Sequence, residues 1–332
     1  MRLHTVLAAL AVACAMATPG ARQAPSPFVG SWNLTGQGPD SSYVYWLGVQ
    51  ESGGQLQGMF LNRSGNPNPL AFVRVENGEL VFRGGPAAAP TGPEYRARLE
   101  GGRLVGRHTL PVTPAAGTAT PSQTAAPRVV NWVGERRPTW PAVNANGAHT
   151  YGSPVALFDG RNLDAFAGQV AGRALGWSVT NGVATNQAGA NNLVSKAAFT
   201  DFRLEAEYLL GDHSNSGFYL RGRYELQVLD DANDTTTRRD LSHMAIYGRT
   251  PPTTRASKPA GEWQTMTAVL VGNRVTVTLN GQRVHDNVEI LGITGGALDA
   301  NELAPGPLMI QGDHTGVSLR RVVITPISTP GR

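Results

Sequence analysis

The sequence contains almost no cysteine and almost no lysine. Its one cysteine, Cys14, lies in an apolar N-terminal stretch, and only Lys196 and Lys258 are lysines among 28 basic residues. If that stretch is removed, the mature chain can form no disulfide bond and use no thiol catalysis. The arginines are scattered and form no basic patch with interleaved aromatic residues, so we expect no nucleic-acid partner.

The sequence also lacks an apolar run long enough to span a membrane. The run at residues 6–17 is too short to remain as a membrane span. It follows Arg2 and ends in Ala15-Met16-Ala17, the small-x-small pattern of a signal peptidase site. We predict a signal peptide at residues 1–17, a flexible leader at 18–27, and an exported bacterial protein, periplasmic or secreted. The sequence before Cys14 is a poor lipobox, so lipid anchoring there is not expected.

No segment of useful length has helical periodicity, whereas glycine (40) and proline (23) are abundant. This composition favours short strands and turns, and 332 residues suggest about two domains. Three turn-plus-strand units carry leucines 24 residues apart, at positions 56, 80 and 104. We predict an antiparallel β domain at residues 28–134, either a small barrel or a sandwich, with His108 at its surface. Its Gly30-x-Trp32 opening resembles calycin-type barrels.

Residues 111–127 are of low complexity, and residues 135–154 read as the linker to a second domain at 155–327, followed by a tail at 328–332. About ten antiparallel strands in the second domain predict a two-sheet jelly roll. The overall fold class is therefore all-β. We expect His213, His243 and His285 at the surface of this domain.

The most informative stretch is residues 215–230, which read as two strands joined by a tight Gly222-Arg223 turn. Alternation places Arg221, Glu225 and Gln227 on one face of this hairpin, opposite an apolar face. A cation, a carboxylate and an amide together are typical of a site for a polar, uncharged ligand such as a sugar. A solvated outer sheet face with a cross-strand ion pair between Arg221 and Glu225 explains the pattern as well.

A set of motifs in the second domain occurs in the order found in a known family. These motifs are Leu157-Phe158-Asp159-Gly160 with Asn162-Leu163-Asp164, Asp201-Phe202 with Glu207, Asn215-Ser216-Gly217 with Arg221, Tyr224-Glu225-x-Gln227-x-x-Asp230, Ala245-Ile246-Tyr247-Gly248, Lys258-Pro259-x-Gly261-Glu262-Trp263, Leu279-Asn280-Gly281, and Gly306-Pro307-Leu308-x-Ile310-Gln311-Gly312-Asp313-His314 leading into Leu319-Arg320-Arg321-Val322. The stretch 155–327 thus resembles the domain of unknown function 1080 family, described as 3-keto-disaccharide hydrolase, 3-keto-glucoside 1,2-lyase or 2-hydroxy-glucal hydratase domains. Arg321 and Gln264 depart from the family pattern, which has Asn at both places.

The resemblance implies a concanavalin-like jelly roll that cleaves glycosides already oxidised at C3 by a separate oxidoreductase. The C3 ketone acidifies the C2 hydrogen, so a base can form an enolate from which the C1 substituent leaves, and water adds back afterwards. This needs a base, an enolate stabiliser and an acid for the leaving oxygen. A divalent cation can serve as the stabiliser, and we expect no organic cofactor.

The predicted catalytic residues are Glu225, His314, Arg221 and Glu207; the predicted substrate-binding residues are Asn215, Tyr219, Gln227, Gln311 and Lys258. His314 or Glu225 would abstract the C2 proton, and Arg221 or a metal would face the enolate oxygen. Glu207, which alternation also places on the polar face of its strand, as it does Glu225, is the next acid/base candidate. Metal-ligand candidates are Glu207, Glu225, Asp230 and His314, although Asp230 is explained equally well as a turn cap.

Two other functions compete with a 3-keto-glycoside-cleaving enzyme. A carbohydrate-binding module would use the same fold without chemistry. An interaction protein would use the first domain, whose partner is unknown, to attach to the cell envelope or to another protein. The density of acid/base residues predicted on one sheet face favours the enzyme.

Overall fold

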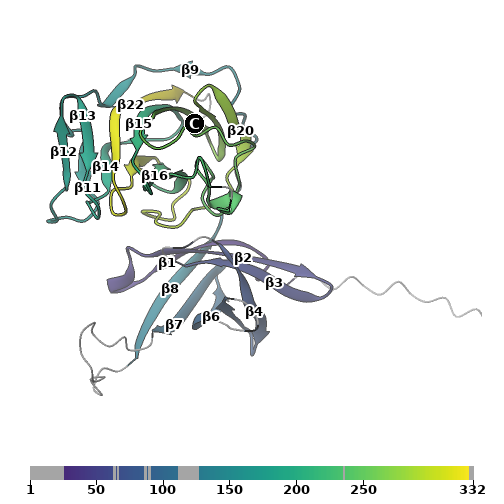
Figure 1. The fold of residues 1–332 in the computed structure, drawn as a ribbon. Coiled ribbons are helices and arrows are strands. Elements are labelled where there is room, and N and C mark those ends of the chain that lie inside the picture. Colours follow the sequence, from purple (N-terminus) through teal and green to yellow (C-terminus); the bar gives the residue numbers. More distant parts are fainter. Residues whose placement is uncertain are drawn as a thin grey trace, which may run out of the picture.

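The computed structural model describes residues 26–62, 65, 67–85, 88, 91–110, 127–234 and 236–328, which form two β domains (Figure 1). The predicted signal peptide, Cys14, most of the leader and of the low-complexity stretch, and residues 329–332 lie outside the described residues. In the part of the chain that is described, no helix has the length and apolar character needed to cross a membrane.

The first domain is a closed antiparallel barrel in which each strand pairs with the next in sequence and β1 pairs with β8. Its strands are β1 (Gly30–Gly36), β2 (Val44–Ser52), β3 (Gln55–Leu61), β4 (Asn68–Glu76), β5 (Glu79–Gly84), β6 (Thr91–Glu100), β7 (Arg103–Leu110) and β8 (Arg128–Arg136), with a short 3-10 helix, η1 (Gly38–Asp40), after β1. The three evenly spaced leucines lie near the starts of β3, β5 and β7, each just after a hairpin turn. The predicted meander is therefore a barrel.

Side chains fill the barrel interior. Along β7 the buried positions alternate, so that Leu104, Gly106 and His108 point inward. Gly106 is required because a Cβ there would lie 2.2 Å from the ring of Trp132. The prediction of a surface His108 is wrong: its ring packs 4.4 Å from that of Tyr95, and burial lowers the pKa of His108 to about 4.

The second domain is a sandwich of two antiparallel sheets, which confirms the predicted jelly-roll architecture. The first sheet runs β12 (Trp177–Thr180), β13 (Val183–Asn186), β22 (Val317–Ser328), β15 (Phe202–Leu210), β18 (Trp263–Val271), β19 (Arg274–Leu279) and β20 (Gln282–Glu289), with β9 (Thr150–Tyr151) and β10 (Val155–Phe158) also paired to β22. The second sheet runs β11 (Phe166–Gly168), β14 (Leu193–Phe199), β21 (Gly306–Ile310), β16 (Asn215–Leu220) and β17 (Tyr224–Leu229), and a 3-10 helix, η2 (Arg239–Leu241), follows β17.

The core lies between these sheets and is built by period-two alternation. On β15, every second residue from Phe202 to Leu210 is buried, while Glu205 and Glu207 point outward. Two histidines expected at the surface belong to the interior. The ring of His243 contacts the Tyr208 hydroxyl at 2.7 Å, and that of His285 contacts the Met244 carbonyl at 2.7 Å, so the surface prediction for both is wrong.

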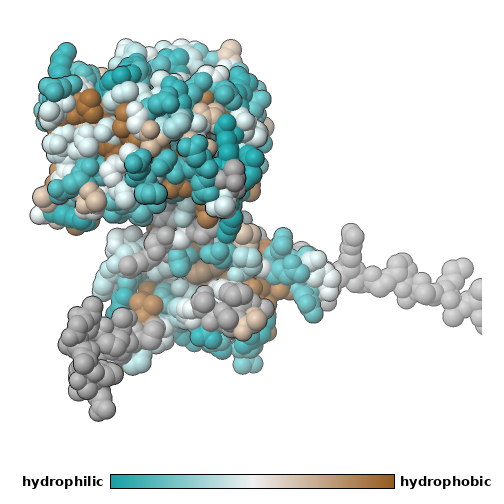
Figure 2. Space-filling view, viewed as in Figure 1, coloured by the Kyte–Doolittle hydropathy of each residue, from teal (hydrophilic) through white to brown (hydrophobic). Residues whose placement is uncertain are grey.

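The barrel and the sandwich share a packed interface. Figure 1 shows β1 and β2 on the side of the barrel next to the sandwich. Val44, Trp46 and Leu61 of the barrel join the buried cluster of the sandwich rather than that of the barrel. Figure 2 shows that the visible face of the sandwich is largely hydrophilic, with hydrophobic residues only in small groups. The apolar contact between the two domains is made by Val44, Trp46 and Leu61, which are buried.

Candidate active site

The predicted hairpin exists, with a longer connection than expected. β16 and β17 pair from Asn215 opposite Leu229 to Leu220 opposite Tyr224, and residues 221–223 connect them. The prediction of a two-residue Gly222-Arg223 turn is therefore wrong. The pairing places Tyr219 opposite Glu225 on the outer face of the sheet, while Phe218 and Leu226 face the core.

A cavity of about 140 Å³ lies on this outer face. It is lined by Asn215, Tyr219, Glu225, Gln227, Tyr247, Gly295, Gly296, Gln311, Asp313 and His314. Gly217, opposite Gln227 in the hairpin, makes room for the central carboxyl group, since a Cβ at Gly217 would lie 2.6 Å from Oε1 of Glu225. The sheet and a local glycine together shape a small polar cavity around one carboxyl group.

Glu225 is the most strongly perturbed acid in this cavity. Its side chain is only 4% exposed, and the Tyr219 hydroxyl is its hydrogen-bond partner. Burial raises the pKa of Glu225 to about 8, and the nearby Asp313 carboxylate adds to the increase, whereas the Tyr219 hydrogen bond opposes it. Glu225 is therefore mostly protonated at neutral pH and can donate a proton.

Tyr247 reaches the cavity because residues 244–247 run alongside the free edge of β17. Met244 N–H donates to the Gln227 carbonyl (2.7 Å), and Tyr247 N–H donates to the Glu225 carbonyl (3.1 Å). A bridge between Leu226 and Ile246 lies between these bonds. Burial raises the pKa of the Tyr247 hydroxyl, with Glu225 adding to the effect, so this hydroxyl is a proton-bearing donor beside Glu225.

Asp313 and His314 form a hydrogen-bonded pair just beyond β21. Asn192 Oδ1 accepts from the backbone N–H groups of Gly312 (2.7 Å) and Asp313 (3.0 Å), which holds this loop in place. The His314 Nδ1 to Asp313 Oδ1 distance is 2.7 Å. This contact raises the pKa of His314 and lowers the pKa of Asp313. Because Nδ1 is engaged, Nε2 is the nitrogen that can exchange a proton with a ligand.

Amide side chains complete the lining. Gln227 Oε1 accepts from Val228 N–H (2.8 Å), so its Nε2 is the group that can donate to a ligand. Gln311 Oε1 is buried and has no hydrogen-bond partner among the described residues. A buried acceptor without a partner is costly, and a ligand hydroxyl would satisfy it. These groups suit a polar ligand that carries several hydroxyls.

The structure removes Arg221 from the predicted site. Arg221 belongs to the hairpin connection, where a φ of 52° ends the strand alternation on which the prediction depended. Its side chain is 0% exposed and donates to the backbone carbonyls of Gly272 and Glu302. The predicted Arg221–Glu225 ion pair and the role of Arg221 at the enolate are therefore both excluded by its position.

Glu207 also lies elsewhere, because the sheets separate it from the cavity. It is on β15 of the first sheet and accepts a hydrogen bond from Arg320 at 2.6 Å on the outer surface. Lys258 donates from Nζ to the Trp263 carbonyl (2.9 Å) and does not line the cavity. Strand parity shows which way a side chain points but not which sheet holds the strand, so the placement of Glu207 was wrong. Lys258 lies outside the named strands and was expected at the site from its family motif, and that placement was wrong too.

Of the four predicted metal-ligand candidates, only Glu225 and His314 line the cavity. Asp230 accepts from His213 N–H at 2.9 Å, as a turn cap does, and Glu207 is in the other sheet. Across the described ranges, no three His, Cys, Asp or Glu side chains are grouped closely enough to hold a metal ion. The side chains present thus do not fit the predicted divalent cation, and the mechanism below passes through none.

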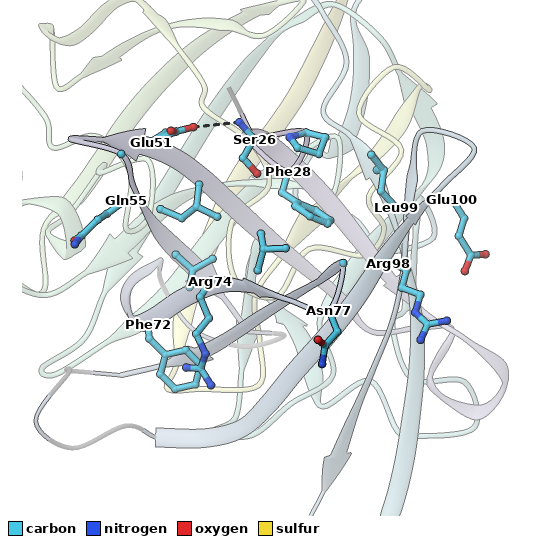
Figure 3. A pocket seen from close by; sticks show the side chains of 16 residues that line it. Ser26, Phe28, Glu51, Gln55, Phe72, Arg74, Asn77, Arg98, Leu99 and Glu100 are labelled. Atoms are coloured by element: carbon cyan, nitrogen blue, oxygen red, sulfur yellow. Dashed lines mark hydrogen bonds between the residues drawn. The ribbon is translucent and has the colours of Figure 1, made fainter. Parts of the chain in front are cut away.

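A larger cavity, of about 1260 Å³, opens at the end of the barrel (Figure 3). Arg74 and Arg98 at its rim are paired with Glu76 and Glu79, respectively. Figure 3 shows Glu51 and Glu100 on opposite sides of this cavity, and Glu51 accepts from Ser26 N–H (3.1 Å). Its size exceeds that of the sandwich cavity, but no acid and base converge in it.

Sequence reasoning missed Tyr247, Asp313 and the two glycines at 295 and 296. An Asp directly before a His was a usable signal for the Asp313–His314 pair. Tyr247 carried no periodic signal, because the segment that places it lies outside the named strands.

No curated protein matches the chain. Two crystal structures of candidate glycosyl hydrolases from Parabacteroides distasonis ATCC 8503 are similar to it. One is 27% identical and the match covers 65% of this chain and 99% of that chain, with a TM-score of 0.47. The other is 20% identical and the match covers 53% of this chain and 94% of that chain, with a TM-score of 0.46. At TM-scores below 0.5 these similarities carry no functional argument.

A family model matches the sandwich domain, including the cavity. The model of the 3-keto-alpha-glucoside-1,2-lyase-like domain matches residues 153–325, just over half of the chain. The matched range contains every residue that lines the sandwich cavity and excludes the barrel. The chain therefore belongs to the family defined by the 3-keto-alpha-glucoside-1,2-lyase-like domain.

Proposed function

We propose that this protein cleaves 3-keto-glycosides by elimination across C1 and C2, with His314 as the base and Glu225 as the acid. The observation that carries the proposal is the pairing of a buried carboxyl group, whose pKa is raised to about 8, with a polarised His–Asp pair in one cavity. A carboxyl group that keeps its proton at neutral pH and an imidazole oriented by a carboxylate supply an acid and a base for acid/base catalysis.

In the first step, His314 Nε2 takes the proton from C2 of the substrate. The electron pair of the C2–H bond forms the C2–C3 double bond, and the C3 carbonyl becomes an enolate. Asp313 supports this step because it orients the imidazole and stabilises the imidazolium that forms. General-base assistance of this kind is typically worth about 10²–10⁴ in rate.

The enolate then re-forms the C3 carbonyl, a double bond forms between C1 and C2, and the bond between C1 and the leaving oxygen breaks. Glu225 donates its proton to that oxygen. Tyr247 and the Gln227 amide supply the hydrogen-bond donors at the cavity wall and take the role first assigned to Arg221. Water added across the new double bond would complete net hydrolysis.

Purified protein incubated with a 3-keto-glucoside tests this proposal directly. We expect release of the aglycone or sugar together with a 2-hydroxy-glucal product, and loss of this release in Glu225→Gln. The matched control is Glu207→Gln, which alters a carboxylate of the same domain outside the cavity and should keep wild-type turnover. Parallel assays with a chelator measure any contribution of a divalent cation.

The result that would replace this proposal is binding without turnover. If the wild type and Glu225→Gln bind the 3-keto-glucoside equally well and neither converts it, the sandwich is a carbohydrate-binding module. Equilibrium binding measured by calorimetry on both proteins distinguishes these outcomes.

A further inference from the structure

One wall of the cavity is formed by residues 292–302, here called the wall segment, which contributes Gly295 and Gly296 to the lining. This segment is hydrogen-bonded to β17 and to the connection of the β16–β17 hairpin. Thr294 Oγ1 accepts from Glu225 N–H (2.9 Å), and Leu298 N–H donates to the Gly222 carbonyl (2.8 Å). The wall segment therefore holds the backbone of the proposed acid directly.

The barrel lies behind this wall. A Cβ at Gly296, where φ is +78°, would lie 2.8 Å from the Tyr219 hydroxyl, on the cavity side. A Cβ at Gly295 would lie 2.3 Å from the carbonyl oxygen of Gly65, on the barrel side. The wall segment is thus packed between Tyr219 of the hairpin and Gly65 of the barrel, with little space on either side.

A buried carboxylate connects the barrel to both elements. Glu302 is 1% exposed and ends the wall segment. It accepts from the Tyr224 hydroxyl (2.9 Å) on the hairpin and from Asn33 Nδ2 (2.8 Å) on β1. Arg137 Nε, just after β8, lies 3.5 Å from the same carboxylate. Removing one partner from a buried charge is costly, so Glu302 depends on the barrel for its position.

We infer that the barrel is a positioning element of the active site, which fixes Glu302 through Asn33 and thereby holds the wall segment and the Tyr224–Glu225 end of the hairpin. This inference rests on the proposed function for its catalytic consequence, but its structural part stands apart from turnover. It assigns a role to a domain that lies outside the family match. Asn33 and Glu302 act through other residues and are positioning residues.

The test uses the full chain and a substitution that reverses the hydrogen bond. Asn33→Asp removes the donor and places two carboxylates together, whereas the double variant Asn33→Asp, Glu302→Gln restores a donor–acceptor pair. Gln at 302 can still accept from the Tyr224 hydroxyl through its oxygen. Asn77→Asp is the matched control, because it makes the same change in the turn between β4 and β5, which lines the barrel cavity.

Hydrogen exchange of the amides in residues 292–302 is the first readout. We expect these amides to exchange about tenfold faster in Asn33→Asp than in the wild type. The double variant should return to the wild-type exchange rate, and the Asn77→Asp control should keep it. The second readout is the pH profile of kcat/KM. A loosened wall exposes Glu225 to water, so we expect the alkaline limb of Asn33→Asp to move to lower pH, which loss of stability alone would not cause.

Wild-type exchange in Asn33→Asp would overturn the inference, and so would faster exchange that the double variant fails to reverse. If Asn33→Asp does not fold, Asn33→Ala gives the same comparison without the added charge. A wild type that shows no turnover defeats the proposed function instead, because the exchange comparison needs no substrate.

Discussion

Burial of Glu225 predicts an unusual dependence of stability on pH. The pKa of its carboxyl group is about 8 in the folded chain, against 4.5 for an ordinary Glu side chain. The folded state therefore binds this proton more tightly than the unfolded state does. The stability that the protonated group contributes is fully present below about pH 4.5 and is lost as pH rises through about 8.

The size of this effect follows from the two pKa values. At about 1.4 kcal/mol per pKa unit, ionising the buried carboxyl group lowers the free energy of unfolding by about 5 kcal/mol in total. Between pH 5 and 7 the free energy of unfolding falls by about 3 kcal/mol, because its slope against pH is close to the maximum in that range. Glu225→Gln keeps the shape of the side chain and removes the titration, so this part of the pH dependence should vanish.

Differential scanning calorimetry of both proteins at pH 5, 6, 7 and 8 measures the difference. As pH rises, the melting temperature of Glu225→Gln should increase relative to that of the wild type, by roughly 5–10 °C between pH 5 and 7. Glu207→Gln is the control, because that side chain is 29% exposed and pairs with Arg320 at the surface. Parallel curves for the wild type and Glu225→Gln would refute the argument that burial sets this pKa.

Three further predictions concern the rest of the cavity. His314→Ala should lower kcat by about 10²–10⁴ while the melting temperature stays near that of the wild type, and an unchanged kcat would remove His314 from the mechanism. Asp313→Asn should move the acid limb of the kcat/KM profile to lower pH, because the Asp313 carboxylate raises the His314 pKa; a limb that stays in place would contradict this. Gly296→Ala should raise KM in steady-state assays, since the new Cβ would meet the Tyr219 hydroxyl and the positive φ disfavours alanine. A wild-type KM in that variant would show that the wall can shift freely.

Local patterns predicted most of the secondary structure and part of the cavity. Glycine-marked turns and alternating residues located the barrel hairpins, including the leucines at the starts of β3, β5 and β7. In the sandwich, parity on β16 and β17 placed Tyr219, Glu225 and Gln227 on one face, and the structure agrees. These predictions succeeded because the side-chain direction in a strand depends only on position along the chain.

The predictions that failed needed information that no local pattern carries. Strand alternation assigns Arg221 to the polar face of the hairpin. The strand ends at Leu220, however, and the guanidinium of Arg221 is buried in the interior. Alternation also assigns Glu207 to a polar strand face, but its strand, β15, belongs to one sheet and β17 belongs to the other. His243 and His285 looked isolated in sequence, whereas chain folding brings Tyr208 and the Met244 carbonyl to them.

The sequence by itself determined that the chain is all-β, that its second domain belongs to a sugar-related family, and that Glu225 lies on a polar sheet face. Only the tertiary structure decided which side chains share the cavity and what their chemistry is. The pairing of β16 with β21 brings Asp313 and His314 to the hairpin, and the path of residues 244–247 brings Tyr247 beside Glu225. The reason is physical: the pKa of Glu225 depends on the water excluded by residues distant in sequence, and that exclusion exists only in the folded chain.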